Sequence, residues 1–331
     1  MEKDRDVERK IVAILNILKD SPKPLGSRII SRKLKEQGFD LTERAVRYHL
    51  RIMDERGLTE SHGIAGRIVT AEGIEEANNA LVSDKVGMII SKVDALSHLT
   101  TFDLNTRSGD IILNVSLIPK EHLEKALEIV AETFKAKLGF TNLLAIAHEG
   151  ETLGGLTIPE EMAGVGTVCS LTINGILLNN CIPLYSKFSG ILKMENSQHK
   201  RFIELIYYDA SSLDPAEVFI KSKMTDVRSA IESGSGKVLA GFREFPAVCL
   251  NNVLEIVEKL EKIGMSGVTA IGKPGQPVLE MPVSAGCVGM VVLGGLNPLA
   301  AVEESGIKTE NKALCAMVNF NVLGNLGTVN T

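Results

Sequence analysis

An internal repeat in the long C-terminal part of the 331-residue chain constrains its fold most strongly. The first set of matches recurs at an offset of 127 residues and comprises Ser108-Gly109, Pro119 and the Leu-Glu-Ile-Val segment at 127–130. The second set recurs at an offset of 123 residues and comprises Pro159, Val165, Gly166 and Asn174. Collinear matches of this length predict a tandem duplication with a four-residue deletion, and hence two halves related by an approximate two-fold axis.

Each copy has the same predicted order of elements. A strand at 111–117 precedes a helix whose apolar side chains Leu123, Leu127, Val130 and Phe134 fall at helical spacing. Further strands follow, one of them rich in glycine. We therefore expect an α/β (α+β) fold with a mixed sheet over residues 84–331, made of repeats at about 84–200 and 201–331.

The N-terminal residues predict a different, smaller domain. Helices are expected at 7–18, 27–37 and 42–57, followed by a hairpin between 59 and 70. Thr42 is a good N-cap, and Gly57 suits a helix C-terminus. This order predicts a winged helix-turn-helix over residues 1–70, with the third helix in the major groove of DNA, and residues 71–83 as an acidic linker helix.

The residues expected to contact DNA are polar side chains on the recognition helix, at the start of the second helix and in the hairpin. They are Arg44, Arg47, Tyr48 and Arg51 on the third helix, Ser27 and Arg28 on the second, and Arg67 in the hairpin. Long donors of this kind can reach phosphates and guanine edges. The alternatives are a solvated cationic face and a winged helix that binds protein or RNA.

Charge is divided unevenly along the chain. Residues 1–70 hold 15 Lys and Arg against 11 Asp and Glu, whereas the rest of the chain has a net charge of −9. A basic head on an acidic body suits a protein whose head alone touches DNA. The five cysteines contain no Cys-x-x-Cys pair, and the sequence has neither an apolar leader nor an apolar run long enough to span a bilayer. We therefore expect a cytoplasmic protein that does not bind a membrane.

A glycine-rich segment at 163–167 and its copy at 284–289 form the candidate small-molecule site. If the two segments are loops that face each other across the two-fold axis, their N–H groups could hold a small anion. The candidate ligand-binding residues are Gly164, Gly166, Thr167, Ser284, Gly286 and Gly289. Close packing of glycines is the alternative. No nucleophile and base set, Walker loop or zinc spacing is present, so we expect no enzyme, metal or cofactor.

The winged helix followed by this duplicated body resembles the archaeal nitrogen-regulatory repressor family, NrpR. The resemblance covers nearly the whole chain and is carried by Ile158-Pro159-Glu160, Gly164-Val165-Gly166 and Cys287-Val288-Gly289. It implies a cytoplasmic repressor of nitrogen-assimilation genes that binds a palindromic operator and responds to 2-oxoglutarate as inducer.

A palindromic operator requires two heads, so we expect a homodimer at least, acting alone or with a second regulatory-domain protein. A dicarboxylate effector requires donors, and the cationic candidates are Arg107, Lys120, Arg243 and Lys273. The alternative function is a winged-helix regulator that senses a different small metabolite, such as an amino acid.

Overall fold

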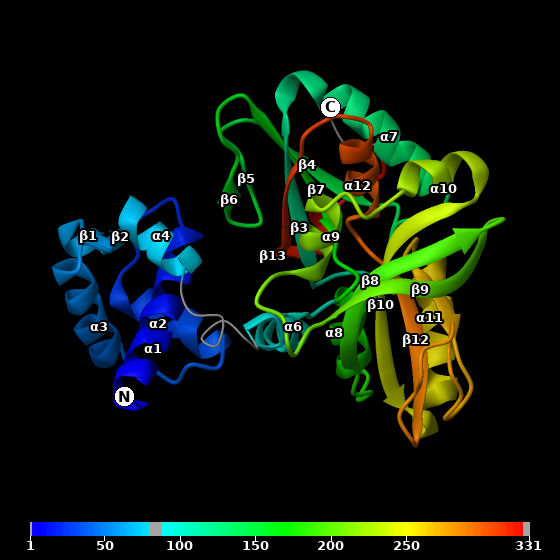
Figure 1. The fold of residues 1–331 in the computed structure, drawn as a ribbon, viewed down its shortest axis with the longest axis horizontal. Coiled ribbons are helices and arrows are strands. Elements are labelled where there is room, and N and C mark those ends of the chain that lie inside the picture. The colour runs from blue at the N-terminus through cyan, green and yellow to red at the C-terminus, as the bar shows by residue number, and fades with distance from the viewer. Residues whose placement is uncertain (1, 80–87, 327–331) are drawn as a thin grey trace. The chain divides into compact units, whose positions relative to one another are not determined.

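The structure is a computed structural model that describes residues 2–79 and 88–326 (Figure 1). The chain forms two compact units, residues 1–95 and 96–331. Positions 80–83 of the predicted linker helix, and positions 84–87 of the helix predicted after it, lie outside the described residues.

The N-terminal unit contains the predicted winged helix-turn-helix. Its elements are α1 (Glu2–Lys19), α2 (Ser27–Glu36), α3 (Glu43–Glu55), β1 (Thr59–Ser61), the 3-10 turn η1 (Gly63–Ala65), β2 (Arg67–Val69) and α4 (Ala71–Asn79). The backbone N–H of Ala45 donates to Thr42 Oγ1 at 3.2 Å, as expected of an N-cap. Val46, Leu50 and Met53 lie in the core of this unit and are fully buried.

The regulatory unit repeats one order of elements twice. After α6 (Met88–Leu99), the first copy comprises β3 (Asp110–Pro119), η2 (Lys120–His122), α7 (Leu123–Lys135), β4 (Leu144–Ala147), a short hairpin of β5 (Thr152–Leu153) and β6 (Leu156–Thr157), β7 (Met162–Val168), α8 (Thr172–Asn179) and β8 (Tyr185–Glu195). The strand β9 (Gln198–Tyr207) and the helices α9 (Pro215–Lys221) and α10 (Val227–Ser233) follow.

The second copy has the same order. It comprises β10 (Gly236–Pro246), η3 (Ala247–Cys249), α11 (Leu250–Lys262), β11 (Val268–Ile271), β12 (Cys287–Leu293), α12 (Asn297–Glu304), β13 (Glu310–Asn319) and η4 (Phe320–Val322). The chain thus contains a structural duplication, with the short hairpin and β9 as additions in the first copy.

The two copies exchange their last strands. One sheet has the order β13-β3-β7-β4 and the other β11-β12-β10-β8-β9. The strand β8 of the first copy pairs with β10 of the second, and β13 of the second copy pairs with β3 of the first. Every pairing between these strands is antiparallel, so the sheets are antiparallel where we predicted a mixed sheet.

The strand register corrects the predicted alignment of the copies. Pro119 pairs with Met162, and its counterpart Pro246 pairs with Cys287, so the second block is offset by 125 residues and not by 123. Gly289 is therefore the counterpart of Gly164, whereas Gly166 corresponds to Val291. The glycine matches were off by two positions because several glycines recur at short spacing in both copies.

The first turns of α8 and α12 show the same correction. Thr172 Oγ1 accepts from the Ile112 N–H at 3.1 Å, and Asn297 Oδ1 accepts from the Leu239 N–H at 2.7 Å. Ile112 and Leu239 are equivalent strand residues, so Asn297 corresponds to Thr172 and not to Asn174 as predicted. Both side chains tie the start of a helix to a buried strand.

Helices from both copies cover each core. Leu127 of α7 and Leu299 of α12 share one core with the stacked rings of Phe188 and Phe242, whose centroids lie 5.2 Å apart. Figure 1 shows α7 and α12 side by side above the sheets, and the two helices are in contact. Ile176 of α8 packs with α11 in a second core. Both of these cores therefore combine residues of the two copies.

The two edge strands of the larger sheet approach each other through one polar contact. His199 Nδ1 of β9 lies 2.5 Å from Thr269 Oγ1 of β11. Burial lowers the pKa of His199 below its ordinary value. Its Nε2 is buried and has no hydrogen-bond partner among the described residues, so a proton there would be costly.

Replacing Asn297 with alanine tests its role at the start of α12. Its amide makes three buried hydrogen bonds, to the Leu239 N–H and to the carbonyls of Leu239 and Leu138. Loss of these bonds should reduce the free energy of unfolding in urea by about 2–4 kcal/mol. The control Asn251→Ala, at an exposed position of α11, should change it by less than about 0.5 kcal/mol.

His199 also predicts a dependence of stability on pH. Its folded-state pKa is depressed, so the unfolded chain takes up a proton that the folded chain resists as the pH falls below about 6.5. Stability should therefore be fully present above that pH and decline below it. His199→Gln should flatten this decline in urea melts, whereas His148→Gln, at an exposed position, should leave it as in the parent protein.

Candidate DNA-binding and effector sites

The outer face of α3 presents the predicted DNA-contacting side chains. Arg44, Arg47, Tyr48 and Arg51 are all exposed. Two of these arginines form intrahelical ion pairs, Arg47 with Glu43 at 3.9 Å and Arg51 with Glu55 at 3.4 Å. Exposed pairs of this type contribute little to stability, so DNA phosphates can replace the carboxylates at low cost.

The start of α2 adjoins this face through one hydrogen bond. Ser27 Oγ donates to Glu43 Oε1 at 3.2 Å, and Arg28 beside it is exposed. Ser27, Arg28 and the first turn of α3 thus form a continuous polar surface. Glu43 is the acidic member of this surface and contacts both Ser27 and Arg47.

Arg67 does not occupy the wing tip as predicted. Its Nε donates to both carboxylate oxygens of Asp54 in α3, at 3.0 and 2.8 Å, and the two side chains are three-quarters buried. The bidentate pair fixes the wing to the recognition helix. The sequence could not show this pairing, because Asp54 and Arg67 lie on different elements.

The glycine-rich segment at 163–167 is part of β7 and is not a loop. Gly164 and Gly166 lie in the interior of the sheet, where Cβ atoms would approach Ile158 Cδ1 at 2.4 Å and Leu113 Cδ2 at 2.7 Å. The Thr167 hydroxyl is buried and has no hydrogen-bond partner among the described residues. Close packing of strands therefore explains these two glycines, and the predicted anion-binding loop is wrong here.

The matching segment at 284–289 is a turn that leads into β12. Gly289 lies in β12, where a Cβ would meet the Phe242 ring at 2.9 Å. The Ser284 N–H donates to Glu244 Oε1 at 3.0 Å, and Gly286 belongs to the same turn. Glu244 is buried and paired with Lys187 at 3.1 Å. Burial alone would raise the pKa of Glu244, but the hydrogen bonds from Ser284 and Lys187 outweigh burial and lower it. The turn therefore already binds an anion, the Glu244 carboxylate.

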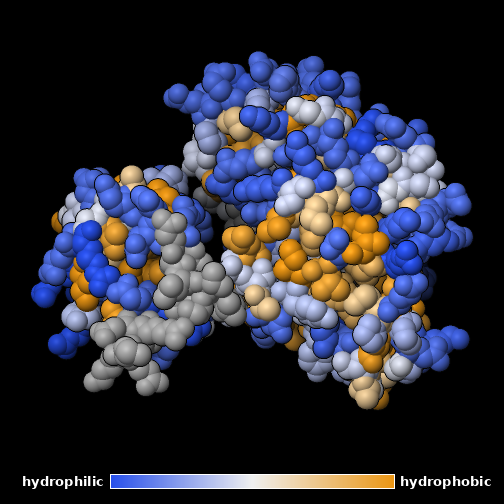
Figure 2. Space-filling view, viewed as in Figure 1, coloured by the Kyte–Doolittle hydropathy of each residue, from blue (hydrophilic) through white to orange (hydrophobic). Residues whose placement is uncertain are grey.

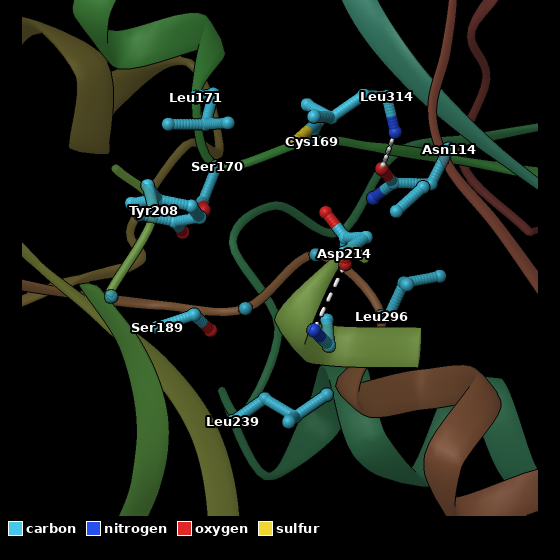
Figure 3. Close-up of a pocket in the computed structure, with 15 residues that line it drawn as sticks. Asn114, Cys169, Ser170, Leu171, Ser189, Tyr208, Asp214, Leu239, Leu296 and Leu314 are labelled. Atoms are coloured by element: carbon cyan, nitrogen blue, oxygen red, sulfur yellow. Dashed lines mark hydrogen bonds between the residues drawn. The ribbon is translucent and has the colours of Figure 1, made fainter. Parts of the chain in front are cut away.

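A small pocket lies instead between the two copies (Figure 3). Five pairs of equivalent positions line it, namely Asn114 and Gly241, Cys169 and Gly294, Ser170 and Gly295, Leu171 and Leu296, and Ser189 and Leu314. The first copy supplies the polar members, and the second copy supplies glycines and leucines. The two copies therefore form one asymmetric site and not two equivalent ones.

Arg243 of β10 contacts the wall of this pocket. Its Nε donates to Asn174 Oδ1 at 3.0 Å, one terminal nitrogen to Ser170 Oγ at 3.0 Å and the other, at 3.5 Å, to the Gly241 carbonyl. The side chain is 1% exposed, and burial lowers its pKa. No carboxylate of the described residues lies within ion-pair distance. A buried, unneutralised guanidinium is costly and marks a candidate anion site.

Tyr208 and Asp214 complete the polar lining of the pocket. Figure 3 shows Tyr208 beside Ser170, and Asp214 accepting a hydrogen bond from the backbone of α9. Burial raises the pKa of Tyr208, so its hydroxyl stays neutral. Asp214 accepts from the Ala216 and Glu217 N–H groups at 2.9 and 3.3 Å, which places its charge at a helix N-terminus.

The other cationic candidates are unsuited to a closed site. Lys120 is exposed and already paired with Glu149 and Glu161, at 3.1 and 2.6 Å. Arg107 and Lys273 lie in exposed surface turns.

Among residues 2–79 and 88–326, no three metal-ligating side chains gather in one place. No helix of these residues has the length and hydropathy needed to cross a bilayer.

Comparison with known proteins identifies both units. Residues 86–325 match the family model of the NrpR regulatory domains NRD1 and 2, and residues 12–77 match the ribonuclease R winged-helix domain. The chain is 36% identical to the global nitrogen regulator NrpRI of Methanosarcina mazei over 97% of its own length and 98% of that protein.

Longer relatives and a solved structure agree with this assignment. The global nitrogen regulator NrpR of Methanococcus maripaludis is 33% identical over 95% of this chain, which spans 54% of that protein. A crystal structure of a nitrogen repressor-like protein from Methanococcus jannaschii matches with a TM-score of 0.62 and 32% identity. It covers 72% of this chain and 98% of its own. The chain therefore belongs to the NrpR family of global nitrogen regulators and is a winged-helix DNA-binding regulator, not an enzyme.

Proposed function

We propose that this chain represses nitrogen-assimilation genes, such as those for nitrogen fixation and glutamine synthetase, in the cytoplasm. It binds a palindromic operator through α3 and leaves it when 2-oxoglutarate occupies the regulatory unit. One observation carries the proposal: the same chain joins a winged helix with an exposed cationic α3 to an NrpR regulatory unit with a buried, unneutralised arginine.

The DNA contacts follow from the exposed face of α3. Arg44, Arg47, Tyr48 and Arg51 contact bases and phosphates in the major groove, and each good base contact contributes about 1–3 kcal/mol of discrimination. Ser27 and Arg28 contact phosphates at the start of α2, where the helix dipole favours anions. Glu43 releases Ser27 and Arg47 when phosphates replace its carboxylate.

A palindromic operator requires two recognition helices about 34–36 Å apart, and this spacing requires at least a homodimer. Exposed hydrophobic side chains of the regulatory unit support self-association. They include Tyr185, Ile203, Tyr207 and Leu213. Figure 2 shows hydrophobic residues gathered on the part of this unit that carries β8 and α9. A second regulatory-domain protein is the other partner that such a surface suits.

The effector site is the pocket between the two copies. Arg243 offers a fixed cation that donates to Ser170 in the pocket wall, and Ser170, Ser189, Asn114 and Tyr208 line the pocket with hydroxyl and amide groups. A 2-oxoglutarate carboxylate that accepts from the guanidinium would neutralise a charge that the protein has buried at a cost. Residues of both copies line the site, so a bound ligand would contact strands of both sheets.

The pocket must open to admit this effector. Its volume of about 40 Å³ holds a few water molecules, since one water needs about 10–15 Å³. A dicarboxylate therefore binds a conformation in which the two halves have moved apart. It shifts the equilibrium only by its preference for that state, typically about 1–3 kcal/mol, and the operator prefers the closed state.

Asp214 favours a second candidate effector. A pocket lined by a carboxylate, with a guanidinium bonded to its wall, suits a zwitterion, so an amino acid is the alternative ligand. Asp214→Asn distinguishes the two, because it removes the counter-charge that an ammonium group requires. This variant should bind 2-oxoglutarate at least as tightly as the parent protein in calorimetric titration, and it should bind an amino acid effector more weakly.

The test of the proposed function is a mobility shift on the promoter of a nitrogen-assimilation gene. The protein should bind the promoter, and millimolar 2-oxoglutarate should release it. Arg47→Ala should lower the slope of log K against log salt by about one, as expected for loss of one phosphate contact. If the protein binds the promoter but 2-oxoglutarate does not release it, the proposed repressor function stands and 2-oxoglutarate is rejected as its effector.

Arg243→Met tests the effector site separately from the fold. Methionine keeps the length of the side chain without its charge, so the free energy of unfolding should change by less than about 1 kcal/mol or increase. The variant should bind operator DNA normally but remain bound at 2-oxoglutarate concentrations that release the parent protein. Lys120→Met is the matched control, because it removes an exposed cation far from any closed site, and it should respond normally.

A further inference from the structure

We propose that the tip of the wing inserts an apolar side chain, Ile64, into the minor groove of the operator. The inference rests on the proposed function, because it requires α3 of the same unit to lie in the adjacent major groove. Ile64 is exposed to 107% of its reference area, more than any other large hydrophobic side chain that the structure describes. Nothing in the described part of the N-terminal unit covers it, so the fold of that unit does not account for it.

The backbone holds this tip in one conformation. The His62 N–H donates to the Gly66 carbonyl at 2.8 Å, which closes the turn around η1. Leu25 and Arg67 exchange two backbone hydrogen bonds at 3.0 Å, and this pairing joins the base of the wing to the loop before α2. Ile64 is therefore presented on a preorganised loop, which lowers the entropic cost of inserting it.

Gly66 shows how closely the wing is fitted. Its φ of +117° lies in the region that favours glycine, and a Cβ there would lie 2.2 Å from the carbonyl carbon and oxygen of Leu25. Only glycine fits this contact, so the wing cannot tilt away from the α1–α2 loop without breaking it. The position of Ile64 relative to α3 is then fixed within the N-terminal unit.

The chemistry of the tip favours a groove over a phosphate. The residues from His62 to Gly66 include no lysine or arginine, and the arginine that follows, Arg67, is held by Asp54. Lysine and arginine are prominent donors to phosphates, and this tip offers neither. The neighbours Gly63, Ala65 and Gly66 are small, so the backbone can approach a minor groove about 6 Å wide.

An isoleucine in the minor groove acts as a wedge. Apolar wedges separate adjacent base pairs in part and bend the duplex toward the major groove. The energy of this distortion depends on the sequence, and flexible pyrimidine–purine steps deform most easily. Ile64 would therefore give the protein a preference for such a step beside the bases that α3 contacts, without any hydrogen bond to that step.

The experiment measures operator affinity, its salt dependence and DNA bending for Ile64→Ala. We expect binding about tenfold weaker, from the lost contact of an isoleucine side chain. We also expect a smaller bend in circularly permuted operator fragments and an unchanged slope of log K against log salt. Ile64→Met should keep most of the affinity and of the bend, because methionine can still act as a wedge.

The control is Val248→Ala, which truncates another exposed hydrophobic side chain, on η3 of the regulatory unit. It should bind and bend the operator like the parent protein. The proposal is overturned if Ile64→Ala binds and bends the operator normally, which would assign Ile64 to a protein partner. It is also overturned if the salt slope falls, which would indicate a phosphate contact. Failure of the parent protein to bind the operator would instead reject the proposed function, and the wedge with it.

Discussion

The exchange of strands between the two copies is the constraint on which the regulatory unit depends. Strand β8 completes the sheet of the second copy, and β13 completes the sheet of the first. Without the exchange, β3 and β10 would each leave a row of backbone groups unpaired in the interior of the unit. The copies therefore fold together as one domain, whose two sheets each contain a strand of the other copy.

This arrangement explains why a symmetric framework holds an asymmetric site. Arg243 and Ser116 occupy equivalent strand positions, because Arg243 pairs with Met290 as Ser116 pairs with Val165. Ser116 donates to Asn311 and is satisfied locally, whereas Arg243 has only neutral partners and keeps its charge. The duplication supplied two equivalent positions on the axis, and the chemistry is concentrated in one of them.

Features with local causes could be predicted from the sequence, and those set by pairing could not. The recognition helix was predicted correctly, since Thr42 and Gly57 bound it and its apolar stripe is local. The glycine-rich segment was misinterpreted because glycine serves both turns and tightly packed strands. Arg243 could not be selected among four cations, because its burial results from contacts with Asn174 and Ser170 on distant segments.

The location of the pocket also suggests how a small ligand could act on the recognition helices, which belong to the other unit. The lining comes from both copies, and the exchanged strands contribute Ser189 and Leu314 to it. A ligand larger than the pocket must therefore displace strands that belong to both sheets at once. Packed cores do not deform continuously, so the displacement takes the form of one half moving against the other as a rigid body. A dimer whose DNA-binding heads depend on this geometry for their spacing would then lose one half-site when the ligand binds.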